Sequence, residues 1–140
     1  MFRKILVAVD GSPQGNNALT AALDIAKRYE AMVSVINVVQ PFTWTVPSSE
    51  VLLLEQSMGK FQAEILEKAV EHGKKQSVEI KAISATGYPP EIIAKTAKAG
   101  KYDLIVIGNR GLSKIDRFLL GSTSEKILRS AECTILVVKD

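Results

Sequence analysis

The sequence predicts an α/β domain in which a parallel sheet is covered by helices on both faces. Apolar runs such as residues 5–9 and 104–107 are continuous rather than alternating, which is typical of strands buried on both faces. Segments with apolar residues at helical spacing separate these runs, and Gly- and Pro-containing turns punctuate them. Strands and helices therefore alternate along the chain, which favours parallel strands joined by right-handed crossovers.

Five strands are expected, at residues 5–9, 32–39, 78–85, 104–107 and 134–138. The third alternates apolar and charged residues, which predicts a position near a sheet edge. Helices are expected at 14–29, 49–75 and 122–129, and another opens within 87–91 and ends near Ala99. Gly59 is expected to weaken or kink the long second helix. With 140 residues and no shift in composition, the sequence predicts a single domain over 1–140.

Composition argues against several classes of function. The chain has 18 basic and 15 acidic residues, and its net charge of +3 is too small and too evenly spread to indicate a nucleic acid or an anionic membrane as partner. No stretch approaches the roughly 18 apolar residues of a membrane span. Cys133 is the single cysteine, so an intrachain disulfide is impossible, and one Cys with one His cannot form a metal cluster. We expect a cytoplasmic protein.

Two segments follow strands at the edge where open α/β sheets bind ligands. One follows the first strand and the other follows the fourth. The one after the fourth strand is the more informative: it reads Gly108-Asn109-Arg110-Gly111, then nine residues, then Gly121-Ser122-Thr123-Ser124. Glycines allow a close backbone approach and positive φ, and the helix start at 121–124 offers free N–H groups and hydroxyls to a phosphate. Arg110 adds a planar cation. Alternatively, Gly108 merely ends a strand and Ser122 merely caps a helix.

The first segment, Asp10-Gly11-Ser12-Pro13, follows the first strand. Asp10 can accept hydrogen bonds from a ribose or an adenine amino group, or it can simply shape the turn with Gly11 and Ser12; both readings stay open. The segment is neither a Walker A loop nor the Gly-x-Gly-x-x-Gly dinucleotide fingerprint.

These residues resemble the universal stress protein family over essentially the whole chain, from Ile5 to Val138. The most specific feature is the pattern Gly-x2-Gly-x9-Gly-Ser/Thr of its ATP-binding subgroup, here Gly108, Gly111, Gly121 and Ser122. The resemblance implies a Rossmann-like three-layer α/β/α sandwich whose five-stranded parallel sheet has the order 3-2-1-4-5. It also implies bound ATP, Mg²⁺ with the phosphates, and homodimers that pair through the last strand, 134–138. One departure is Thr134, where the family usually has proline after the cysteine.

The same resemblance implies which residues contact the nucleotide. Those at the nucleoside are Ala8, Asp10 and Val38; those in the first half of the phosphate loop are Ile107, Gly108, Arg110 and Gly111; those in the second half are Gly121, Ser122, Thr123 and Ser124. No catalytic residue and no protein ligand to the metal is expected.

The predicted function is a nucleotide-dependent regulatory or stress-response module that acts as a homodimer on a protein partner the sequence does not identify. The alternative is a slow ATP hydrolase that needs a partner, because no general base is positioned near the γ-phosphate. A third reading, a flavodoxin-type electron carrier, expects a hydroxyl-rich phosphate loop after the first strand, which Asp10-Gly11-Ser12-Pro13 fits poorly.

Overall fold

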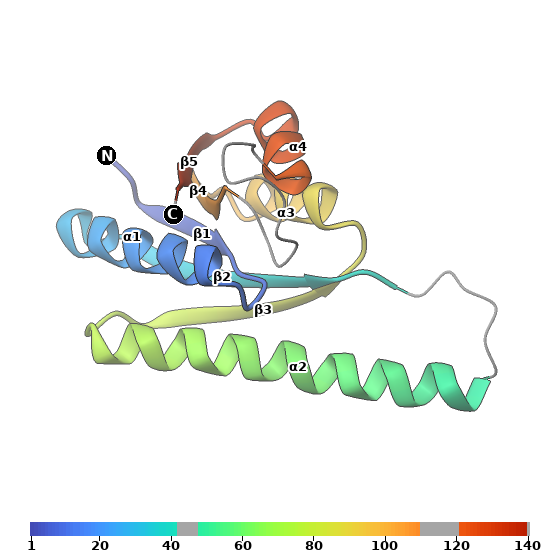
Figure 1. The fold of residues 1–140 in the computed structure, drawn as a ribbon. Coiled ribbons are helices and arrows are strands. Elements are labelled where there is room, and N and C mark those ends of the chain that lie inside the picture. Colours follow the sequence, from blue (N-terminus) through green and yellow to red (C-terminus); the bar gives the residue numbers. More distant parts are fainter. Residues whose placement is uncertain (42–47, 110–120, 140) are drawn as a thin grey trace.

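The computed structural model describes residues 1–41, 48–109 and 121–139. Its strands are β1 (Lys4–Ala8), β2 (Met32–Val39), β3 (Ile80–Thr86), β4 (Leu104–Gly108) and β5 (Thr134–Val138). Its helices are α1 (Pro13–Tyr29), α2 (Ser48–Lys75), α3 (Pro89–Ala99) and α4 (Ser122–Ser130). All strand pairs are parallel, and the order is β3-β2-β1-β4-β5 (Figure 1). The expected fold class and strand order are confirmed.

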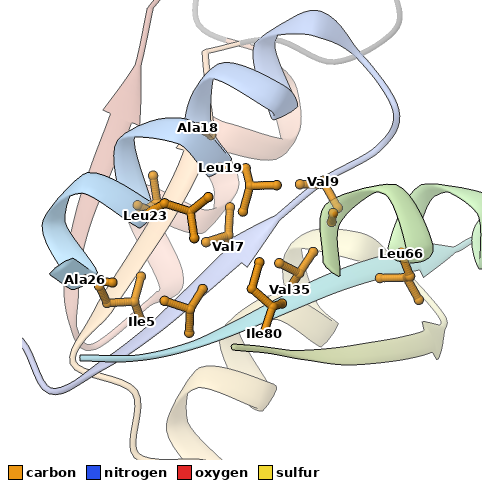
Figure 2. Packing of buried hydrophobic residues seen from close by; sticks show 14 of the residues in the cluster. Ile5, Val7, Val9, Ala18, Leu19, Leu23, Ala26, Val35, Leu66 and Ile80 are labelled. Carbon is orange, nitrogen blue, oxygen red and sulfur yellow. The ribbon is translucent and has the colours of Figure 1, made fainter. Parts of the chain in front are cut away.

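The sheet separates two hydrophobic layers. Because successive side chains of a strand point to opposite faces, Ile5 and Val7 pack toward α1 and α2, whereas Leu6 packs toward α3 and α4. Figure 2 shows the first layer, where Leu19 and Leu23 of α1 meet the odd-numbered residues of β1. Helices on both faces explain why the central strands are mostly apolar, with Ser34 and Asn37 of β2 as buried polar exceptions.

Both edge strands carry partly exposed side chains. β3 lies at an edge of the sheet, as its sequence predicts, and begins at Ile80 rather than residue 78. Its burial does not alternate strictly: Ile80 is buried, Ala82 is exposed, and Ile83 and Ala85 are half-buried. β5 forms the other edge and pairs with β4 alone. The fold therefore leaves the outer side of β5 open among the described residues.

The long helix α2 runs without interruption through Gly59, so the expected kink there is wrong (Figure 1). A glycine keeps its backbone hydrogen bonds, and it lowers helix stability without necessarily bending the helix. Among the described residues, no helix is both long enough and apolar enough to cross a bilayer.

Candidate functional site

The carboxyl ends of β1 and β4 lie side by side where the strand order reverses. From β1 the chain continues into α1 on one face of the sheet, and α4, which precedes β5, covers the other face (Figure 1). In open α/β sheets, the crevice that binds ligands is expected beyond the strand ends at such a point.

The turn after β1 satisfies its own polar groups. Asp10 Oδ1 accepts a hydrogen bond from the Ser12 N–H at 2.9 Å, and Ser12 Oγ accepts one from the Gly15 N–H at 3.1 Å. Ser12 is the N-cap of α1 and is buried, and Gly11 adopts a positive φ of 88°. Asp10 thus shapes the turn with one carboxylate oxygen, and no hydrogen bond within the described residues involves the other.

Among the described residues, no side chain caps the start of α4. Its N-cap is Gly121, which has no side chain to accept the first-turn N–H groups. The backbone N–H groups of Ser122, Thr123 and Ser124 precede the first intrahelical donor, Glu125, whose N–H bonds the Gly121 carbonyl at 3.0 Å. Such amides, together with the positive end of the helix dipole, attract anions.

The starts of α1 and α3 offer less to an anion. At α1 the Ser12 side chain occupies one of these donors. At α3 the first two residues are Pro89 and Pro90, which have no N–H. Of these three starts, α4 combines a first turn that no described side chain caps with a place at the crevice.

Gly108 ends β4 against the first turn of α1. A Cβ at this position would come within 2.9 Å of the carbonyl carbon, the carbonyl oxygen and the Cβ of Gln14. Gly108 does not use the positive φ that glycine allows, since among the described glycines only Gly11 and Gly87 have one. The observed need for glycine here comes from the close packing of α1 on β4.

Ser124 ties α4 to β4. Its buried hydroxyl donates to the Gly108 carbonyl at 2.7 Å, so that proton is not available to a ligand in this structure. Ser122 and Thr123 are exposed, and their hydroxyls remain accessible. The phosphate-binding potential of Ser124 therefore resides in its backbone N–H.

The structure brings most of the sequence-predicted residues to one edge. Ala8, Val38 and Ile107 all face the layer of α3 and α4, toward the carboxyl ends of their strands. Asp10 and the start of α4 lie at the same edge. Arg110 and Gly111 fall outside the described residues, so their predicted contacts stay predictions.

Residues 1–139 match the universal stress protein family. The chain belongs to this family. The universal stress protein YxiE of Bacillus subtilis is 34% identical over 148 residues, which covers 99% of this chain and 100% of that protein. The universal stress protein MJ0531 of Methanocaldococcus jannaschii is 33% identical over 141 residues, covering 99% and 83% of the two chains.

Solved structures of family members share the fold. The universal stress protein UspA of Lactobacillus plantarum superposes with a TM-score of 0.90 at 25% identity, covering 99% of this chain and 98% of its own. A universal stress protein in complex with cAMP superposes with a TM-score of 0.77 at 28% identity, covering 98% and 97%.

Two polar side chains at this edge were not singled out from the sequence. Asn37 of β2 is 6% exposed and donates from Nδ2 to the Val9 carbonyl at 2.7 Å. Gln62 of α2 donates from Nε2 to the carbonyls of Asn37 at 2.9 Å and Ala85 at 3.1 Å. A polar residue within a mostly apolar strand was the available indication for Asn37.

Proposed function

We propose that this chain binds an adenine nucleotide, with ATP as the expected ligand, in the crevice between β1 and β4. The observation that carries the proposal is the uncapped start of α4, where the N–H groups of Ser122, Thr123 and Ser124 face no intrahelical acceptor. The phosphates lie at this turn, and the nucleoside extends toward Ala8, Asp10 and Val38. The family member solved with cAMP supports the ligand class.

A divalent ion, expected as Mg²⁺, accompanies the phosphates. The described residues contain no group of three or more His, Cys, Asp or Glu side chains that could hold a metal. Mg²⁺ prefers oxygen ligands and commonly keeps several waters beside phosphate oxygens, so this edge suits an ion that enters with the nucleotide.

The test is calorimetric titration of Mg-ATP into wild type, Ser122→Pro and Ser122→Ala. Ser122 is the first helical residue, where proline is tolerated, and Gly121 has the extended ψ of 152° that proline requires before it. Ser122→Pro removes both the N–H and the hydroxyl, whereas Ser122→Ala removes only the hydroxyl. We expect affinity to fall roughly 10-fold or more in Ser122→Pro, and less in Ser122→Ala. Wild-type affinity in Ser122→Pro would contradict the proposed phosphate position.

We propose that the protein acts by nucleotide occupancy, as a switch on a partner protein, rather than by turnover. Asp10 follows β1, on the side of the crevice proposed for the nucleoside, and one of its carboxylate oxygens accepts from the Ser12 N–H. Its distance from the proposed phosphate position makes it a poor general base for a water at the γ-phosphate. The alternative, a slow ATP hydrolase, is separated by a steady-state assay. A rate above about 1 s⁻¹ would favour the enzyme.

We further propose that two chains pair through β5, residues 134–138, and that the dimer works in the cytoplasm. β5 is an edge strand with partly exposed apolar side chains, an arrangement that soluble proteins usually cover. Sedimentation at micromolar concentration tests this, because a monomer at that concentration would contradict pairing.

A further inference from the structure

We propose that Asn37 is a positioning residue of the candidate site: its side chain takes the Val9 carbonyl and so leaves the Val38 backbone amide free for a ligand. The inference deepens the proposed nucleotide-binding function and rests on it. The evidence is where the hydrogen-bond ladder between β1 and β2 stops.

The ladder ends at a defined bond. The register pairs Ala8 with Ile36, and the Val9 N–H then donates to the Ile36 carbonyl at 3.0 Å. In a parallel pair the next bond would join the Val38 N–H to the Val9 carbonyl. In this structure the Val9 carbonyl instead accepts from Asn37 Nδ2 at 2.7 Å, and the pairing does not reach Val38.

Side-chain direction explains how Asn37 reaches that carbonyl. Val33 and Val35 of β2 belong to the layer of α1 and α2, and so does Val9 (Figure 2). Asn37 continues the same alternation and lies on this face. Its buried amide therefore bonds the end of β1 from the α1–α2 side, while Val38 faces the opposite layer.

β2 itself is held in place from the other side. Gln62 of α2 joins the carbonyls of Asn37 and Ala85, and the β2–β3 register continues to Val39 and Thr86. Thus β2 stays in the sheet for three residues beyond Ile36 while β1 turns away after Val9. Alternate residues of a strand direct their backbone groups to the same neighbour, so the Val38 N–H and C=O point toward the space that β1 leaves.

That space lies at the same carboxyl edge of the sheet as the crevice, on the β2 side of β1. The Val38 N–H and C=O would offer a donor and an acceptor side by side, which is the pattern that the edge of a nucleobase can pair with. Asp10, which follows directly after Val9, lies near the same space. With a residue that cannot donate at position 37, the Val9 carbonyl would be left without this bond in a buried place. We expect it to pair with the Val38 N–H instead, which would extend the ladder and close the donor to a ligand.

The experiment compares wild type, Asn37→Val and the control Ser84→Val. Ser84 is the register partner of Asn37 on β3 and is exposed. The control therefore introduces a valine next to position 37 and keeps the Asn37 amide. Each protein is titrated with Mg-ATP and with inorganic tripolyphosphate, and backbone amide exchange is followed by NMR. Asn37→Val should bind ATP roughly 3- to 10-fold more weakly, with tripolyphosphate affinity unchanged and Val38 exchange slowed. Ser84→Val should match wild type in all three.

Equal ATP affinity in wild type and folded Asn37→Val would overturn this inference alone. A wild type that binds no ATP would overturn the proposed function and the inference with it. If Asn37→Val does not fold, amide hydrogen exchange in the wild type tests the inference instead. The Val38 amide should exchange faster than the ladder-paired Ile36 amide and become protected when ATP is added, and equal rates without nucleotide would refute the inference.

Discussion

Replacing Gly108 by alanine should destabilise the protein in the absence of any nucleotide. The added Cβ would lie 2.9 Å from three atoms of Gln14, two of which belong to the backbone of α1. A backbone carbonyl cannot rotate away as a flexible side chain can, so α1 must shift relative to β4. The residue that the family pattern associates with ligand binding is thus also a packing requirement.

The magnitude follows from two opposing contributions. Overpacking costs roughly 1–3 kcal/mol, and contacts with backbone atoms place this site near the upper end. Alanine also restricts the unfolded chain, which returns about 0.4–1 kcal/mol. The net loss in the free energy of unfolding is about 2 kcal/mol, or roughly 8 °C in Tm for a domain of this size. Urea unfolding followed by far-UV circular dichroism, without nucleotide, measures it.

Gly59→Ala is the matched control because it makes the same chemical change in open space. A Cβ at Gly59 meets no atom within 4 Å, and the residue lies inside α2. We expect a gain of about 0.5–1 kcal/mol from helix propensity alone. Unchanged stability in Gly108→Ala, or an equal loss in both variants, would refute the packing argument.

Three further outcomes follow from single contacts. Ser12→Ala removes the N-cap bond to the Gly15 N–H and should cost about 1 kcal/mol by urea unfolding, whereas Ser122→Ala, which removes no cap bond, should change stability by less than about 0.5 kcal/mol. Tyr102→Phe removes a buried hydroxyl that donates to Ser34 Oγ at 2.8 Å, and we expect a loss of about 1–2 kcal/mol in the same assay; a wild-type midpoint would show the bond to be energetically neutral. Burial raises the pKa of the Cys133 thiol, so at pH 8 a smaller fraction of it is thiolate than in an exposed thiol. Iodoacetamide should therefore react more slowly with Cys133 than with glutathione. Equal reaction rates for Cys133 in the folded protein and for glutathione would contradict the raised pKa. Unfolding in urea should bring the two rates together.

Periodicity along the chain was enough to predict the elements and their arrangement in layers. The unbroken apolar run at β4 indicated a strand covered on both faces, and the alternation in β3 indicated an edge strand; both are confirmed. Boundaries moved by one or two residues where end contacts decide them, as at β1, where the N–H groups of Arg3 and Lys4 bond the Asp103 carboxylate. The strand order came from the family pattern.

The detail of the candidate site was decided by tertiary structure. The packing of Gly108 on Gln14, the Ser124 bond to the Gly108 carbonyl and the Asn37 bond to the Val9 carbonyl join residues far apart in the chain. Each depends on strand register and on how closely a helix approaches the sheet. Local sequence patterns record which face a side chain occupies, because that repeats with the period of the element. They do not record which backbone group lies opposite, because that is set only when the layers come together.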